Sequence, residues 1–158
     1  MAIAAGDRLP DGTFLVMGED GPEPFTLDTA GRKVVIFGLP GPFTGTCTTA
    51  HVPSFQRTAD DFTAKGVDAI YCVAVADPFV MKAWQESMGA DKITFLADPS
   101  SDFTTAIGLN FTAPPVGFYD RSKRYSMLVE DGVVNSVNLE ESPGTCDTSG
   151  GEALLETV

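Results

Sequence analysis

Two runs of consecutive apolar residues are the strongest pattern in the chain. Residues 33–39 read KVVIFGL and residues 68–76 read DAIYCVAVA, and both are rich in β-branched side chains. Continuous apolar runs of this length are typical of strands that are buried on both faces, as in a parallel sheet. We therefore predict two central strands here, and a third, shorter strand at residues 92–97, KITFLA.

After each of the first two strands the apolar positions change to helical spacing. The first helix is expected to end near Gly66, and its Pro53 suits a first helical turn. The second is expected to begin at Pro78, with Asp77 as its N-cap. The apolar positions of the first helix are Val52, Phe55, Ala59 and Phe62, and those of the second are Phe79, Val80, Ala83, Trp84 and Met88.

The second half of the chain predicts antiparallel structure. The pair Asp131-Gly132 separates apolar runs at 124–129 and 133–139, which is a strong hairpin signal. A short helix is expected through about Ile107, and a closing helix at 150–158. A small β element is expected near the start, at residues 14–17.

This order of elements predicts an α/β fold with a mixed central sheet flanked by helices, which is the thioredoxin-like architecture. We find no internal repeat or low-complexity linker, so residues 1–158 are expected to form one domain. In such folds, ligand chemistry is found at the carboxyl ends of the parallel strands.

Charge and composition exclude several classes of partner. The chain carries a formal net charge of −12, which argues against nucleic acid and anionic membrane surfaces. The N-terminus does not resemble a secretory signal, and no apolar run approaches the length of a membrane span. Its three cysteines are widely spaced, unlike a secreted disulfide framework. We expect a cytoplasmic protein with reduced thiols at rest.

Cys47 is the residue most suited to chemistry. It follows the first long strand and lies in the first turn of the predicted helix, where free N–H groups and the helix dipole stabilise a thiolate. Thr44 can point its hydroxyl at the same space. Pro40 has no N–H, so it can exclude water without competing for hydrogen bonds.

Other interpretations of Cys47 stay open at this point. A free cysteine is often simply a small buried apolar residue. The spacings of a metal site and of a CxxC dithiol are both absent. His51, the only histidine, lies one helical turn after Cys47, so a hydrolytic Cys–His pair is formally possible. Such pairs, however, generally come from separate parts of a fold.

The residues around Cys47 resemble a known family. The spacing Pro40-x-x-x-Thr44-x-x-Cys47 and the wider string PGPFTGTCTTAHVPSF are similar to the peroxiredoxins, and within them to the type II, or atypical two-cysteine, branch (the peroxiredoxin five subfamily). Further blocks of resemblance follow in order, so that it covers essentially the whole chain. They are residues 66–67, 75–84, 95–98 and 122–129.

The resemblance implies a thiol-dependent peroxidase that reduces hydrogen peroxide and small organic hydroperoxides without a cofactor or a metal. Cys47 would be the peroxidatic nucleophile and would become a sulfenic acid. Arg124 would stabilise the thiolate and polarise the O–O bond. Thr44 would hydrogen-bond the thiolate or the peroxide. Pro40 would shield the pocket.

Three further features of the pocket follow from the same resemblance. Gly45 and Thr46 would line the peroxide site, with the backbone N–H groups of Thr46 and Cys47 as donors. Gly45 replaces the proline that the family usually has after the threonine, which changes the rigidity of this loop. His51 also matches a family histidine, for which we expect a supporting role.

The sulfenic acid must be reduced by a second thiol, and three sources are possible. Cys72 lies within an apolar strand, and Cys146 lies in a loop of small and polar residues. The third source is an external thiol that attacks directly. Thioredoxin or glutaredoxin with glutathione would supply the reducing equivalents.

Two alternatives to the enzyme remain. One is a peroxide-sensing redox protein that uses Cys47 for signalling without efficient turnover. The other is a protein of the same fold in which Cys47 is only structural. Members of the family commonly form symmetric dimers, so we also expect a homodimer that involves Phe43, Pro78, Phe79 and Trp84.

Overall fold

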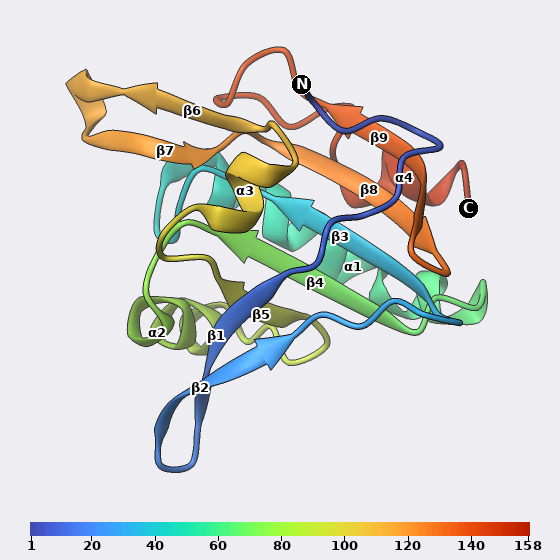
Figure 1. The fold of residues 1–158 in the computed structure, drawn as a ribbon, viewed down its shortest axis with the longest axis horizontal. Coiled ribbons are helices and arrows are strands. Elements are labelled where there is room, and N and C mark those ends of the chain that lie inside the picture. Colours follow the sequence, from blue (N-terminus) through green and yellow to red (C-terminus); the bar gives the residue numbers. More distant parts are fainter.

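Three parallel strands form the centre of this computed structural model, which describes residues 1–158 (Figure 1). They are β3 (Lys33–Gly38), β4 (Ala69–Ala74) and β5 (Thr94–Ala97), and β4 pairs with both of the others. All three were predicted from their apolar runs. Strand β4 is almost fully buried, as expected for a central strand covered on both faces.

Antiparallel strands extend this sheet on both sides. Beside β5 lie β1 (Thr13–Gly18) and β2 (Gly21–Thr26), and beside β3 lie β8 (Tyr125–Glu130) and β9 (Val133–Leu139). The complete order is β2-β1-β5-β4-β3-β8-β9. The predicted mixed sheet is therefore confirmed. The first half of the chain was expected to be parallel, but its strands β1 and β2 are antiparallel, so the sheet is antiparallel at both edges.

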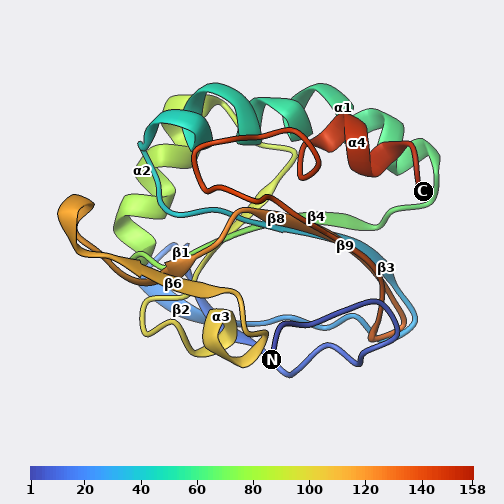
Figure 2. The ribbon, with the colours of Figure 1, turned by 90° about the horizontal axis from the view of Figure 1, so that it is seen from above.

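The helices cover both faces of the sheet (Figure 2). Helices α1 (Val52–Ala64), α2 (Pro78–Met88) and α4 (Gly151–Leu155) lie on one face, and α3 (Asp102–Ala106) lies on the other with the N-terminal segment. Each face has its own apolar core. The core under α1 and α2 contains both Cys47 and Cys72. None of the helices has the length and apolar character needed to cross a bilayer.

The local signals that predicted element boundaries act as expected. The Asp77 carboxylate accepts a hydrogen bond from the Val80 N–H at 2.9 Å, as an N-cap should. Asp131 and Gly132 both have positive φ, at 48° and 77°, which matches the tight turn between β8 and β9.

Two features were not predicted. The segment Cys47–His51 forms a π-helical turn, η1, that runs directly into α1. A second, two-stranded sheet, made of β6 (Asn110–Ala113) and β7 (Phe118–Ser122), projects from the body of the molecule (Figure 1). A single 3₁₀ turn, η2 (Pro114–Val116), joins its strands.

Candidate active site

Cys47 lies at the carboxyl end of β3, where the chain turns into η1. Its side chain is fully buried. The first helical bond of this turn runs from the Thr48 N–H to the Thr44 carbonyl at 3.0 Å. The N–H groups of Thr46 and Cys47 precede it and have no acceptor within the protein. The thiol therefore lies beside free backbone donors, as predicted for the start of a helix.

Arg124 is the side chain that contacts the thiol. Its Nη2 lies 3.2 Å from Cys47 Sγ, and its side chain is almost completely buried, with 2% of the residue exposed. The Nε and Nη2 groups donate to the Pro143 carbonyl at 3.0 and 2.8 Å. The Nη1 group lies 3.0 Å from His51 Nδ1. All three nitrogens of the guanidinium are thus held in place.

The charge of Arg124 has no carboxylate partner. None of the ion pairs in the structure includes it. A buried cation is stable only when an opposite charge or strong hydrogen bonds compensate it. Of the groups that Arg124 contacts, only the Cys47 sulfur can become an anion. The guanidinium is therefore placed to stabilise negative charge on this sulfur, and a thiolate is the form of cysteine that acts as a nucleophile.

His51 supports Arg124 from the other side. Because a guanidinium can only donate, His51 Nδ1 accepts from Arg124, and the ring proton lies on Nε2. Nε2 donates to the Ser149 carbonyl at 3.1 Å. Burial and the charge of Arg124 lower the pKa of His51 to about 3. The ring is therefore neutral and cannot be the protonated partner of a hydrolytic pair.

The buried neutral His51 predicts a specific loss of stability in mild acid. Its ordinary pKa of 6.5 is lowered on folding, so the unfolded chain binds the proton that the folded chain excludes. Below about pH 6 stability should fall with a slope that approaches about 1.4 kcal/mol per pH unit. Urea unfolding between about pH 5.5 and 6.5 measures it, since carboxylates stay mostly ionised there.

A variant separates the contribution of this histidine from other titrations. His51 is the only histidine in the chain, so His51→Gln should flatten the dependence of the unfolding free energy on pH in that window. An unchanged slope in His51→Gln would show that the ring is not held neutral in the folded state.

A small cavity of about 270 Å³ opens beside Arg124. Eight residues line it. Arg124 and four others were proposed from the sequence, and three were not. The predicted ones are Pro40, Thr44, Gly45 and Thr46, and the others are Phe118, Pro143 and Gly144. Residues from four separate parts of the chain thus meet beside Arg124, whose guanidinium contacts the Cys47 sulfur. Cys47 itself is fully buried and does not line the cavity.

The hydroxyl of Thr44 does not donate to the Cys47 sulfur, although this was one of the roles expected for it. It donates to the Gly41 carbonyl at 2.7 Å and makes no hydrogen bond to Cys47. With its proton engaged, the oxygen still has lone pairs that can accept a hydrogen bond from an O–H group in the cavity. The Thr44 oxygen is therefore free to accept a hydrogen bond, whereas its proton is not available to the Cys47 sulfur.

The backbone of Pro40 is held by a hydrogen bond, whereas Gly45 has open space around it. The Pro40 carbonyl accepts from Arg121 Nη1 at 3.1 Å, which connects this loop to the β6–β7 sheet. A Cβ on Gly41 would lie 2.6 Å from the same Arg121 nitrogen, so the end of the arginine side chain would have to shift to admit it. A Cβ on Gly45 would meet nothing within 4 Å. The unusual Gly45 is therefore not required by packing.

The other two cysteines have different environments. Cys72 is fully buried in β4, and burial and the nearby Cys47 raise the pKa of its thiol. Cys146 is half-buried in the loop before α4. Burial raises the pKa of Cys146 too, and Arg124 and Ser149 oppose this. The charge of Arg124 acts to lower the pKa of both thiols.

Sequence reasoning missed the contribution of the loop before α4. Pro143, Gly144 and Ser149 act through backbone carbonyls, which carry no side-chain signature. The only available signal was the small-residue composition of ESPGTCDTSGG. No group of three or more His, Cys, Asp or Glu side chains is placed to hold a metal ion.

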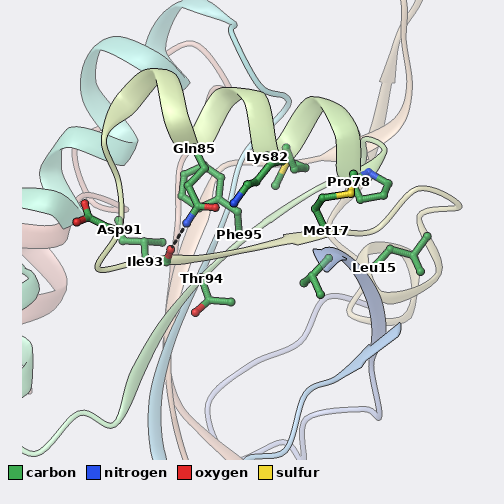
Figure 3. A pocket seen from close by; sticks show the side chains of 11 residues that line it. Leu15, Met17, Pro78, Lys82, Gln85, Asp91, Ile93, Thr94 and Phe95 are labelled. Atoms are coloured by element: carbon green, nitrogen blue, oxygen red, sulfur yellow. Dashed lines mark hydrogen bonds between the residues drawn. The ribbon is translucent and has the colours of Figure 1, made fainter. Parts of the chain in front are cut away.

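A second cavity, of about 190 Å³, lies between α2, β1 and β5 (Figure 3). Gln85 donates across it to the Ile93 carbonyl at 2.9 Å. Six of its eleven lining residues are hydrophobic, including Leu15, Met17 and Phe95. Arg124, which contacts the Cys47 sulfur, lines the first cavity and not this one, so we assign the chemistry to the cavity beside Arg124.

Comparison with known proteins gives a consistent result. The chain matches the family described as Redoxin over residues 4–155. It is 44% identical to peroxiredoxin-2E-2, chloroplastic, of Oryza sativa subsp. japonica, over 99% of this chain and 72% of that protein. Among solved structures, it is similar to reduced Prx3 in complex with H2O2 from Vibrio vulnificus, with a TM-score of 0.92 and 41% identity over 98% of both chains. It is also similar to peroxiredoxin 5 from Alvinella pompejana, with a TM-score of 0.83 and 32% identity over 98% of this chain and 97% of that one.

Proposed function

Because the chain belongs to the redoxin family and is a peroxiredoxin, a thiol-dependent peroxidase, we propose that Cys47 is its peroxidatic nucleophile. The observation that carries this proposal is the 3.2 Å contact between Arg124 Nη2 and Cys47 Sγ in a buried site without a carboxylate. An arginine that lacks an acidic partner and contacts one thiol favours the thiolate of that cysteine.

The proposed reaction moves charge from sulfur to oxygen. The Cys47 thiolate attacks the nearer oxygen of ROOH, an S–O bond forms, and the O–O bond breaks. The attacked oxygen is the one that carries the hydrogen, so Cys47 becomes a sulfenic acid, and the leaving oxygen takes a proton from solvent and departs as water or an alcohol. Arg124 stabilises this transfer because its fixed N–H groups remain close to the moving negative charge.

The other residues of the cavity bind and orient the peroxide. In the proposed complex, the Thr44 oxygen accepts from the peroxide hydroxyl, and the N–H groups of Thr46 and Cys47 donate to its oxygens. Pro40 and Phe118 limit access of water to the sulfur. A volume of about 270 Å³ is enough for hydrogen peroxide or a small organic hydroperoxide, which we propose as the substrates.

We propose that Cys72 is the resolving thiol. It shares an apolar core with Cys47. Burial is the main cause that raises the pKa of its thiol, and the nearby Cys47 is the second. Cys72 is fixed in β4 between Phe37 of β3 and Phe95 of β5, so Cys47 must approach it. This requires η1 to unwind. The sulfenic acid and the Cys72 thiol then form a disulfide and release water.

Mass spectrometry after one equivalent of H2O2 tests this assignment. We expect a product 2 Da lighter than the reduced protein, as the loss of two hydrogens requires, with Cys47 and Cys72 in one cross-linked peptide pair. In Cys72→Ser the sulfenic acid should persist, whereas Cys146→Ser should still form the bond. A Cys47–Cys146 bond, or a lasting sulfenic acid in the unmodified protein, would contradict it.

For the external reductant we propose thioredoxin or glutaredoxin with glutathione. Support comes from the disulfide chemistry itself, since both systems reduce disulfides by thiol exchange. Assays with each reductant should give many turnovers of H2O2 with at least one of them. Consumption of a single equivalent with both would instead favour the peroxide-sensing alternative, which the peroxidase relatives do not favour.

We also propose that the protein forms a homodimer in the cytoplasm. Phe43 and Phe79 are 57% and 63% exposed, and Phe43 lies close to Trp84 beside the active site. Exposed aromatic side chains of this kind are typical of interfaces. Sedimentation at micromolar concentration tests the dimer, and a monomer there would contradict it. Cell fractionation tests the location, and recovery outside the cytosolic fraction would contradict it.

A further inference from the structure

The loop before α4, residues 141–150, holds three side chains of the active site through its carbonyl groups. The Pro143 carbonyl accepts twice from Arg124, and the Ser149 carbonyl accepts from His51. The Gly144 carbonyl accepts from Thr46 Oγ1 at 2.8 Å. We call this segment the carbonyl loop. Its conformation determines where the guanidinium lies relative to Cys47.

The carbonyl loop has little apolar packing of its own. Most of its residues are exposed, and only Ser149 and Gly150, at its end, are buried. A loop of this composition has many accessible conformations, so some specific interaction must select one.

Glu140 supplies that interaction. It follows β9 directly, and only 9% of it is exposed. Its Oε2 accepts from the N–H groups of Asp147 and Ser149, both at 2.7 Å, and from Ser149 Oγ at 2.6 Å. Its Oε1 accepts from Thr145 Oγ1 at 3.5 Å. One carboxylate thus binds both the middle and the end of the carbonyl loop.

No cation pairs with this carboxylate. The ion pairs of the structure do not include Glu140, so its charge is compensated by N–H and O–H donors of the loop. Burial raises the pKa of Glu140, but the hydrogen bonds from Ser149, Asp147 and Thr145 outweigh this and lower it. The ionised carboxylate and the loop conformation therefore stabilise each other.

We propose that Glu140 is a positioning residue for the peroxidase reaction: its carboxylate holds the carbonyl loop, and the loop holds Arg124 against Cys47. The backbone strengthens this connection, because the Glu140 N–H donates to the Arg124 carbonyl at 3.0 Å. The inference rests on the proposed roles of Cys47 and Arg124, and it adds a residue that does not touch the substrate.

Glu140→Gln is the direct test, with Glu141→Gln as its matched control. Glutamine is similar in size, but its NH2 group cannot accept hydrogen bonds from the loop donors. Glu141 is exposed and makes no side-chain hydrogen bond, so its substitution changes the net charge equally and leaves the loop contacts intact. The rate of Cys47 oxidation by H2O2 can be followed by stopped-flow fluorescence of Trp84. This is the only tryptophan, and its Nε1 donates to Thr48 Oγ1 beside Cys47.

We expect the second-order rate constant of Glu140→Gln to fall about 10-fold to 100-fold, because small displacements of a catalytic group have effects of this size. Glu141→Gln should react at the wild-type rate. Alkylation of Cys47 by iodoacetamide should also require a higher pH in Glu140→Gln, since the displaced guanidinium no longer stabilises the thiolate. A purely structural role would not change this alkylation profile in a folded protein. Glu140→Asp should recover part of both losses.

Two further results decide the interpretation. If Glu140→Gln does not fold, Ser149→Ala removes one donor to the carboxylate and should change rate and alkylation profile in the same direction, by a few-fold. If folded Glu140→Gln, or failing that Ser149→Ala, keeps the wild-type rate and alkylation profile, the proposal is overturned. The proposed function would still stand after that result, provided that Cys47→Ser and Arg124→Gln lose the fast reaction.

Discussion

Replacing Cys47 with serine should lower peroxide turnover by more than about 10⁴-fold, because a serine hydroxyl is not ionised near neutral pH and is a far weaker nucleophile. The side chain is fully buried and serine is nearly the same size, so the fold should be retained. Peroxide consumption in the presence of a thiol reductant measures the effect, and thermal unfolding checks the fold.

The remaining cysteines provide the controls. Cys72→Ser and Cys146→Ser should both keep fast oxidation of Cys47 by the first equivalent of peroxide, since neither sulfur contacts Arg124 through a hydrogen bond. Peroxidase activity that survives in folded Cys47→Ser would make the cysteine structural and would move the chemistry to another thiol.

Replacing Arg124 should have the second largest effect. We expect Arg124→Gln to lower the rate of Cys47 oxidation by about 10²-fold to 10³-fold, the usual cost of removing one fixed donor from a site of charge transfer. Arg124→Lys keeps the charge, but one ammonium group cannot reach Cys47, His51 and the Pro143 carbonyl in the geometry of a guanidinium. It should therefore restore only part of the rate.

The same substitution should also destabilise the protein. Arg124→Gln leaves the Pro143 carbonyl and the buried His51 Nδ1 without the guanidinium donor, and an unsatisfied buried group such as this ring nitrogen costs about 1–3 kcal/mol. Lys123→Gln is the matched control, because it removes a neighbouring charge that makes no side-chain hydrogen bond. Equal rates in Arg124→Gln and Lys123→Gln would exclude a role of Arg124 in the reaction.

The parts of the fold that could be predicted are those with local signals. Strands β3 and β4 follow from their apolar runs, and the start of α2 follows from Asp77 and Pro78. The π-helical turn at Cys47 has no such signal, because nothing in the letters CTTAH favours it over an ordinary helix. The β6–β7 sheet was missed because its strands are short and joined by a proline-rich turn.

The part of the candidate site that is formed by side chains could be predicted from the sequence. Pro40, Thr44 and Arg124 were proposed from the sequence, and the structure places all three around one cavity. The orientation of the Thr44 hydroxyl was not predictable, because it depends on the position of the Gly41 carbonyl. Arg124 was expected to begin a strand, but it precedes β8 and points into the core.

The contacts of the carbonyl loop could not be predicted from the sequence alone. Its contacts to Arg124, His51 and Thr46 use backbone oxygens, which every residue type has. Glu140 lies next to Glu141 in the sequence, and only the fold distinguishes a carboxylate with several donors from one in solvent.

The most direct test of the central claim uses a chain with Cys47 as its only cysteine, the double variant Cys72→Ser with Cys146→Ser. The protein is mixed with one equivalent of H2O2 and dimedone, which traps sulfenic acids, and the products are identified by mass spectrometry. The proposed role of Cys47 predicts rapid consumption of the peroxide, a dimedone adduct on Cys47, and a much slower reaction when Arg124→Gln is added. A free Cys47 thiol after the peroxide has been consumed, or equal rates with and without Arg124, would contradict it.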